Sequence, residues 1–382
     1  MIFLHIVPVN PYGKKYVSFV SKNFDNQTHL FIYFSEKADE ELESFNSNSC
    51  IVMRILRWDS LENFLNRYIP IINHVFMHSL FFDPKILFKI KEVLRKFGKD
   101  RDFSWVLWGG DLYNYYLSNS QNPNDWFLNE LKKIIVNDAY SIIALMEEDY
   151  YFAKEKFGTK AKCQYAFYPI IISIEDLEKL VIESKKSEEL RENSQLEDKK
   201  VKKILVGNSA TSTNNHFEAL EALKRINLED DFEIICPLSY GDKNYAEKVM
   251  SYGNNLFGER FKGLTNWMLP SEYGKFLLDI DVAIFNFKRQ QGLGNIISLF
   301  YLGKKIYIRS DSPIWHFTSR LGLKAFDFLE LLSNNDVSDN LEFFKIESSW
   351  IENNMQIVKN EFSEKKCKEL WEKVFQEVSH KV

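Results

Sequence analysis

Short apolar runs alternate with amphipathic stretches along most of the chain. In the first half, runs typical of buried strands cover residues 1–7, 28–34, 52–56, 71–77, 105–108, 141–146 and 164–168. A stretch with helical periodicity covers 83–99 and follows the fourth of these runs. Strands that alternate with helices predict a parallel sheet covered by helices on both faces.

The second half repeats this alternation without repeating the sequence. Strands are predicted at 203–206, 232–237, 282–286 and 305–309, and helices at 215–226, 245–252, 271–278, 294–302 and 313–321. From residue 340 the chain has a charged, helical pattern. The predicted fold class is therefore α/β, with two doubly wound Rossmann-like domains. Ligands of such sheets bind at the carboxyl ends of the strands, so we expect a cleft there between the domains.

A charged segment separates the two halves. Residues 175–203 contain seventeen charged residues in twenty-nine positions and no aromatic residue. This composition predicts a solvated linker between domains at 1–174 and 204–340, with a helical tail at 341–382. A long charged surface helix within one domain is the alternative.

Composition narrows the possible functions. Aromatic residues make up 15% of the chain, which excludes extensive disorder. The 49 basic and 54 acidic residues give a net charge of −5, which argues against a nucleic-acid binder. Four widely spaced cysteines without CxxC spacing indicate reduced thiols rather than a metal site. No signal-peptide pattern and no window of about 18 apolar residues occur, so we expect a cytoplasmic protein.

The most informative loop is 207–216, which follows a predicted strand and opens a helix. Its small polar residues, from Gly207 and Asn208 to Asn215 and His216, offer hydroxyls and backbone N–H groups at a helix N-terminus. Such a loop suits a phosphate or a sugar. It is neither a Walker A loop nor a GxGxxG turn. An ordinary capped turn is the alternative.

The stretch 286–295 has the same position after a strand and before a helix. Gly292 and Gly294 permit close approach of a ligand to the backbone. Arg289 offers a fork of donors to a diphosphate, and Gln290 and Gln291 can hydrogen-bond sugar hydroxyls. Two such loops in one domain indicate a nucleotide diphosphate ligand.

Three further segments are weaker candidates. Asp111 follows a predicted strand and two glycines, where a carboxylate can act as a general base or cap a helix. His74 and His78 have metal-ligand spacing for a helix, but the segment reads as a strand, which favours structural histidines. Tyr240 and Asp242 follow another strand and either hold the nucleoside or form a plain turn.

A basic helix is predicted over 85–101. Its seven positive residues outnumber its two acidic residues by five. We call the positive residues the basic face: Lys85, Lys89, Lys91, Arg95, Lys96, Lys99 and Arg101. Each basic residue near anionic lipid contributes about 1 kcal/mol, so this face could dock the protein on the inner surface of the cell membrane. A surface helix with its lysines in water is the alternative.

Together, residues 108–113, 205–220, 237–242 and 289–295 resemble the 4-acetamido-4,6-dideoxygalactose transferases of glycosyltransferase family 56. The resemblance covers most of residues 75–325. It implies GT-B architecture, with an N-terminal acceptor domain and a C-terminal domain that binds the nucleotide sugar. It also implies transfer of this sugar from a dTDP donor to an undecaprenyl-diphosphate-linked or other surface-glycan acceptor, without a metal cofactor.

The resemblance and the loops together assign site residues. The expected donor-binding residues are Gly207, Asn208, Ser209, Thr213, Asn214, Asn215, His216, Glu218, Tyr240, Asp242, Asn286, Arg289, Gln290, Gln291, Gly292, Gly294 and Asn295. The expected acceptor-side residues are His78, Trp108, Gly110 and Tyr113, with Asp111 as candidate base.

The stereochemical outcome stays open. Many retaining GT-B enzymes carry two glutamates after the strand that here ends at Asn286, but no glutamate lies between Glu272 and Glu330. Two other functions also remain possible: a nucleotide-sugar 2-epimerase of the same architecture, which needs no acceptor, and a binding partner without catalytic activity.

Overall fold

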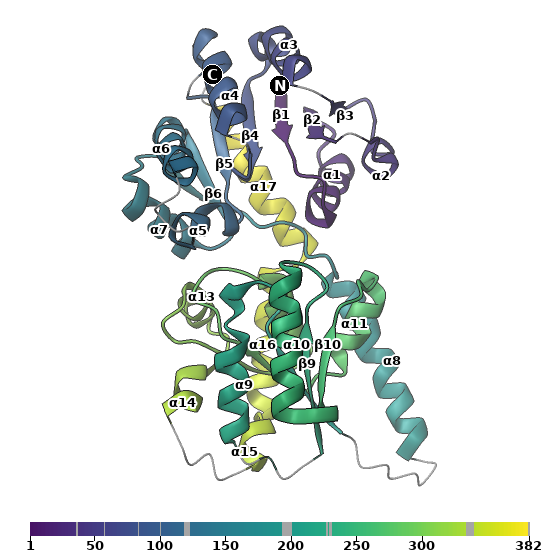
Figure 1. Cartoon of the computed structure of the whole chain (residues 1–382). Coiled ribbons are helices and arrows are strands. Elements are labelled where there is room, and N and C mark those ends of the chain that lie inside the picture. Colours follow the sequence, from purple (N-terminus) through teal and green to yellow (C-terminus); the bar gives the residue numbers. More distant parts are fainter. Residues whose placement is uncertain are drawn as a thin grey trace. The chain divides into compact units, whose positions relative to one another are not determined.

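The computed structural model describes two compact units (Figure 1). It describes residues 1–35, 37–56, 58–82, 84–99, 101–117, 123–192, 201–226, 228, 231–333 and 340–380. The first unit comprises Met1–Ile171 and Glu364–Val382, and the second comprises Ile172–Ser363.

The first unit is built on a seven-stranded parallel sheet with strand order β3-β2-β1-β4-β5-β6-β7. The strands are β1 (Ile2–Ile6), β2 (Thr28–Phe34), β3 (Cys50–Ile55), β4 (His74–His78), β5 (Phe103–Val106), β6 (Ser141–Ala144) and β7 (Lys162–Tyr165). The helices are α1 (Pro11–Asn23), α2 (Glu40–Glu43), α3 (Trp58–Tyr68), α4 (Pro84–Lys96), α5 (Gly110–Leu117), α6 (Pro123–Asp138), α7 (Glu147–Phe157) and α17 (Glu364–Ser379).

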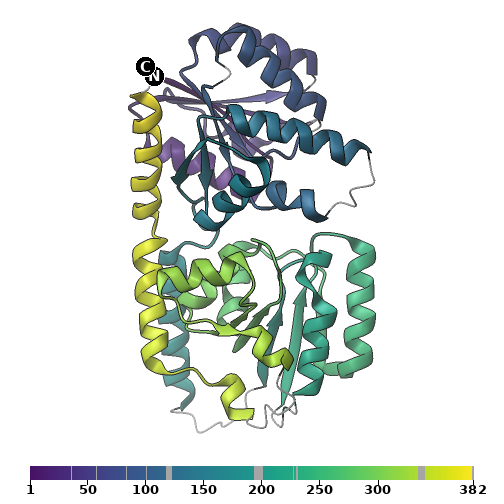
Figure 2. The same ribbon diagram turned by 90° about the vertical axis from the view of Figure 1, so that its left-hand side faces the viewer.

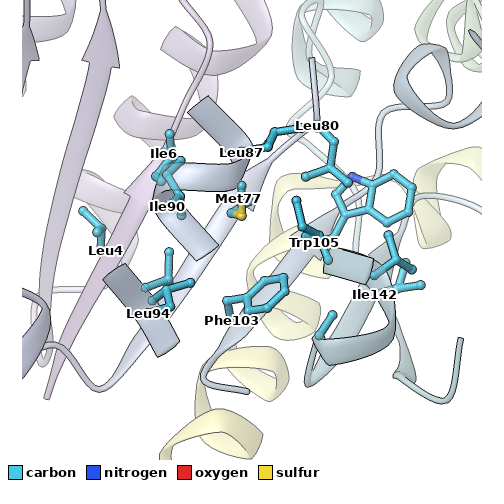
Figure 3. Packing of buried hydrophobic residues seen from close by; sticks show 14 of the residues in the cluster. Leu4, Ile6, Met77, Leu80, Leu87, Ile90, Leu94, Phe103, Trp105 and Ile142 are labelled. Carbon is cyan, nitrogen blue, oxygen red and sulfur yellow. The ribbon is translucent and has the colours of Figure 1, made fainter. Parts of the chain in front are cut away.

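One face of this sheet carries the apolar core. Alternate residues of the strands, such as Leu4 and Ile6 of β1 and Met77 of β4, point to this face and are buried (Figure 3). Leu87 and Ile90 of α4 lie against them at helical spacing. The predicted helix over 83–99 is thus confirmed as α4, which ends three residues earlier, at Lys96. Asp83 lies outside the described residues.

The other face is covered by α17, although this helix follows the second unit in the sequence. The rings of Phe375 and Phe3 stack with centroids 5.4 Å apart, and the rings of Trp371 and Tyr16 are 4.7 Å apart. The indole Nε1 of Trp371 donates to the Phe167 carbonyl at 2.9 Å. Figure 2 shows α17, in yellow, beside the strands of this unit.

The second unit has a six-stranded parallel sheet with strand order β10-β9-β8-β11-β12-β13. The strands are β8 (Lys202–Val206), β9 (Phe232–Pro237), β10 (Phe261–Leu264), β11 (Val282–Phe285), β12 (Lys305–Ile308) and β13 (Phe326–Asp327). The helices are α8 (Ile174–Glu192), α9 (His216–Arg225), α10 (Lys243–Phe257), α11 (Pro270–Leu278), α12 (Leu293–Tyr301), α13 (Pro313–Leu321), α14 (Phe328–Ser333), α15 (Asn340–Phe344) and α16 (Ser348–Glu361). The strand order reverses at β8, where such sheets bind ligands.

The observed division of the chain differs from the predicted domains in two places. Much of the predicted linker is α8, which packs on the second unit: Glu178 pairs with Lys359 at 2.8 Å, and Leu180 lies against Gly274. This matches the alternative of a long charged helix; residues 193–200 lie outside the described part. The predicted tail at 341–382 is shared, because α15 and α16 belong to the second unit and α17 to the first.

Candidate functional site

Two loops meet at the carboxyl edge of the second sheet. The loop after β8 leads into α9, the loop after β11 leads into α12, and the two strands are neighbours. The Thr213 hydroxyl donates to Oε1 of Gln291 at 2.7 Å and accepts from Nε of Arg289 at 3.2 Å. The structure therefore brings together the two loops that the sequence singled out.

The first loop requires glycine at its start. Gly207 has φ of +72°, and a Cβ there would lie 2.6 Å from Nε2 of His216 and 2.8 Å from Oδ1 of Asn214. Asn214 is fully buried and holds the loop. Its Oδ1 accepts from the Asn208 amide at 3.0 Å, and its Nδ2 donates to the Ser209 carbonyl at 3.0 Å. Asn214 therefore shapes the loop.

His216 begins α9 and is fully buried. Its Nδ1 lies 3.2 Å from the Tyr245 hydroxyl, and its Nε2 has no hydrogen-bond partner among the described residues. Burial lowers the pKa of His216 to about 4, so the imidazole is neutral at neutral pH. His216 thus leaves one nitrogen unsatisfied at the helix end that faces the loop.

The glutamine side chains of the second loop are mostly shielded from solvent. Gln290 and Gln291 are buried, and Oε1 of Gln290 has no partner within the described part of the chain. Gly292 has φ of +62°, and a Cβ there would lie 3.1 Å from Cγ of Asn208. Gly294 lies in the first turn of α12, and Nδ2 of Asn295 donates to the Tyr273 hydroxyl at 2.9 Å.

A buried arginine that the sequence did not single out joins this edge. Arg309 follows β12, and its Nη1 donates to Oε2 of Glu218 at 2.8 Å and to Oδ1 of Asn286 at 2.9 Å. Asp311 pairs with the same guanidinium at 2.9 Å, which lowers the pKa of that carboxyl. Asn215 also reaches the Asn286 carbonyl, at 2.8 Å. The Glu218 side chain is 47% exposed, so this network presents a carboxylate to solvent.

Tyr240 and Asp242 have different roles. The Tyr240 hydroxyl accepts from Nδ2 of Asn208 at 2.8 Å, which ties it to the first loop. Asp242 caps α10, because its Oδ1 accepts from the Tyr245 amide at 2.8 Å. The plain-turn alternative therefore describes Asp242, while Tyr240 belongs to the loop cluster.

In the first unit, Asp111 is fully buried and both of its carboxylate oxygens are bound within the fold. Oδ1 accepts from the Trp108 amide at 3.0 Å, and Oδ2 accepts from the Leu80 amide and from Nε1 of Trp105, both at 2.8 Å. Burial raises the pKa of Asp111. This geometry favours the helix-cap alternative over the candidate base, because the carboxylate holds the entry to α5 and meets no solvent.

We expect Asp111→Asn to keep turnover and to lower the melting temperature. The new amide N–H₂ would face N–H donors, which costs about 1–3 kcal/mol of unfolding free energy. Thermal melting and the transfer rate, measured on the same preparation, test this. A fall in rate of about 100-fold or more with unchanged melting would restore Asp111 as a base.

The other acceptor-side candidates, Gly110, Tyr113, Trp108 and His78, also have close neighbours within the first unit. The Tyr113 hydroxyl donates to Oδ1 of Asp149 at 2.8 Å, and a Cβ on Gly110 would lie 2.7 Å from the Phe81 ring. Nε1 of Trp108 donates to the Tyr168 hydroxyl at 2.9 Å, and the same hydroxyl contacts Nδ1 of His78.

His78 is one end of a buried histidine chain. Its Nε2 lies 3.0 Å from Nδ1 of His5, and Nε2 of His5 lies 3.0 Å from Nδ1 of His29. The Trp108 indole can only donate, so the Tyr168 O–H takes Nδ1 of His78 as its acceptor. The N–H of His78 then donates to His5, and the N–H of His5 donates to His29. Nε2 of His29 has no partner within the described residues. Both ring nitrogens of His78 thus have partners within the fold, which is what a structural histidine requires.

The buried histidines predict that the protein loses stability in acid. Burial lowers the pKa of His29 and of His78 to about 3, against about 6.5 in an unfolded chain. Between these values the unfolded state binds more protons, so the unfolding free energy falls as pH drops below about 6.5, by up to about 1.4 kcal/mol per pH unit for each histidine. Urea unfolding from pH 8 to pH 5 measures this, and His29→Gln should show a shallower slope. An equal slope in both proteins would contradict the prediction.

Comparison with known proteins agrees with this architecture. The family model described as 4-alpha-L-fucosyltransferase, glycosyl transferase group 56, matches residues 71–351, which is more than half of the chain. A glycosyltransferase from Rickettsia africae is similar in structure, with 13% identity, a TM-score of 0.67 and coverage of 99% of this chain and 98% of that chain.

Two other solved structures share the fold. Alr3699/HepE from Anabaena, in complex with UDP and glucose, has 11% identity and a TM-score of 0.68, over 99% of this chain and 100% of that chain. UDP-GlcNAc 2-epimerase from Neisseria meningitidis has 12% identity and a TM-score of 0.51, with both chains covered completely. At these identities the similarity shows the fold, which is GT-B. Because the family model matches residues 71–351, more than half of the chain, the chain belongs to glycosyl transferase group 56 and is a glycosyltransferase.

Proposed function

We propose that the protein transfers a deoxy-amino sugar of the 4-acetamido-4,6-dideoxygalactose type from a dTDP donor to an undecaprenyl-diphosphate-linked or other surface-glycan acceptor. The observation that carries the donor assignment is the pair of polar loops at neighbouring strands β8 and β11, joined through Thr213, Arg289 and Gln291. The Anabaena protein was solved with UDP and with UDP-glucose, which supports a nucleoside diphosphate as the ligand class.

The donor loops would act mainly by electrostatics. Helices α9 and α12 both begin at this edge. The backbone N–H groups of their first turns would attract an anion bound there. Arg289 adds a positive charge that would stabilise the diphosphate as the sugar leaves. Glu218 and Asn286, fixed by Arg309, would hold sugar hydroxyls.

We propose that this chemistry proceeds without a metal cofactor. Among the described residues, no group of three or more His, Cys, Asp or Glu side chains is arranged to hold a metal ion. The N-termini of α9 and α12 and the Arg289 guanidinium would supply the positive charge that the leaving diphosphate needs. On this basis we expect transfer to continue in excess EDTA. Loss of activity in EDTA, restored by a divalent cation, would contradict this proposal.

A donor panel tests the proposed function. Thermal shift with dTDP-, UDP- and GDP-sugars should show the largest stabilisation with the dTDP-sugar, since a ligand that binds only the folded state raises the melting temperature. The selected donor is then incubated with a lipid-diphosphate disaccharide. A sugar found on the lipid supports the transferase; a donor converted to its epimer without acceptor would identify an epimerase, and binding without turnover a binding partner.

We also propose that the protein docks on the inner membrane surface through the basic face of the first unit. No helix in the described ranges is long and apolar enough to cross a bilayer. The side chain of Phe88 on α4 is exposed beside these lysines. Lys89 pairs with Glu62 at 2.8 Å and Lys91 pairs with Asp138, so the surface is less positive than the sequence count suggests.

Vesicle co-sedimentation tests the docking. The protein should bind vesicles that contain anionic lipid at low salt and dissociate as salt rises. Changing Lys85, Arg95 and Lys96 together to Gln should weaken binding, at about 1 kcal/mol for each residue. Unaltered binding of this variant would place the docking surface elsewhere.

A further inference from the structure

Three large side chains on the segments that follow β9 and β10 in the second unit are exposed. The side chains of Tyr240, Trp267 and Leu269 are 50%, 63% and 62% exposed. Tyr240 follows β9 and Trp267 follows β10, and these strands are paired through Pro237 and Leu264 near their carboxyl ends. The Tyr240 and Trp267 rings lie 6.2 Å apart at an interplanar angle of 64°. Exposed aromatic rings grouped in this way mark a surface that a ligand covers.

Backbone and side-chain bonds fix Tyr240, one member of this aromatic pair, relative to the first donor loop. The Tyr240 hydroxyl accepts from Nδ2 of Asn208 at 2.8 Å, and the Ala210 amide donates to the Tyr240 carbonyl at 2.7 Å. The Asp242 amide donates to the Ala210 carbonyl at 2.8 Å. Gly241 has φ of +114°, and a Cβ there would lie 2.5 Å from the Ala210 carbonyl oxygen, so only glycine permits this contact. The Tyr240 ring therefore has a set position next to the Gly207 loop.

We propose that Tyr240 and Trp267 form the platform on which the base of the donor nucleotide stacks. The inference rests on the proposed function, because it assigns the phosphates to the loops after β8 and β11. A nucleoside diphosphate carries one flat aromatic base, separated from its phosphates by a single pentose. Tyr240 is bonded to Asn208 of the phosphate loop, and Trp267 lies against Tyr240, so the pair adjoins the loop that would hold the phosphates. The faces of the two rings offer the stacking that a base prefers.

This platform would provide affinity and not the choice of base. Every base has a π-face, so stacking on an aromatic side chain tolerates different bases. Loss of Trp267 should therefore weaken dTDP and UDP by similar factors. Discrimination between them would come from hydrogen bonds elsewhere in the site.

The test compares nucleotide binding with pyrophosphate binding. Calorimetry gives Kd for dTDP and for UDP, and inorganic pyrophosphate is measured as a competitor. In Trp267→Ala, Kd for both nucleotides should rise roughly 5- to 100-fold, with little change for pyrophosphate. Trp267→Phe keeps a ring and should recover most of the affinity. Trp350→Ala, which removes a partly exposed tryptophan from α16, is the matched control.

The outcomes separate this inference from the proposed function. Arg289→Ala should weaken both the nucleotides and pyrophosphate. If Arg289→Ala does so while Trp267→Ala binds dTDP and UDP like the wild-type protein, the donor site stands and the base lies elsewhere. If the wild-type protein binds none of dTDP, UDP and GDP, the proposed function fails and this inference fails with it. An equal loss of pyrophosphate in Trp267→Ala would also overturn the platform.

Discussion

Replacing Trp371 with alanine is expected to destabilise the first unit by about 3–5 kcal/mol. The indole is fully buried between α17 and the sheet, against Tyr16 and Phe375. Its removal leaves a cavity and deprives the Phe167 carbonyl of its indole donor, so that only the weaker Cys367 thiol, at 3.2 Å, still donates to it. Urea unfolding, followed by circular dichroism, should show a markedly lower midpoint.

The control for this variant is Trp350→Ala, which removes a partly exposed indole from α16 in the second unit. Its midpoint should change little, because surface substitutions usually stay within about 0.5 kcal/mol. Trp371→Phe should fall between the two. Equal midpoints for the two alanine variants would contradict the placement of α17 on the first sheet.

Replacing Arg289 with alanine is expected to weaken binding of the donor nucleotide by about 1.5–3 kcal/mol, the usual range for a hydrogen bond to a charged group. Arg289 belongs to the second loop, where its Nη1 donates to the Gln290 carbonyl at 3.0 Å, and its Nε reaches the first loop and donates to Thr213. In calorimetry, Kd for dTDP should rise roughly 10- to 150-fold.

Arg225→Ala is the matched control for Arg289, because it removes an exposed arginine from the last turn of α9, at the opposite end of that helix from the loop. It should bind dTDP as the wild-type protein does. If both variants bind dTDP normally and remain folded, Arg289 has no part in the donor site.

The sequence predicts the fold and the positions of the two polar loops well, because both depend on local features of the chain. A strand, a polar loop and a helix are contiguous, so the apolar run before Gly207 and the helical pattern after His216 place the loop at a strand end. The same holds for the loop that ends at Gly292. Parallel pairing of β8 and β11 then brings both loops to one edge.

Long-range packing is what the sequence could not show. The spacing of Cys367, Trp371, Val374 and Val378 predicts an amphipathic helix, but it does not say that this helix lies on the first sheet rather than the second. The histidine chain depends on the register of β1 and β4, and Arg309 is a single basic residue after a short strand. Asp111 has the sequence context of a site residue, and only the three donors that the fold brings to its carboxylate point to a structural role.

Hydrogen exchange with and without dTDP tests the central claim most directly, because it reports on each segment of the folded chain. The account predicts slower exchange of the backbone amides in 207–215 and 287–295 when dTDP is bound, with the segments in the first unit unchanged. Protection confined to the first unit, or absent from both loops at saturating dTDP, would contradict the assignment of the donor to the carboxyl edge of the second sheet.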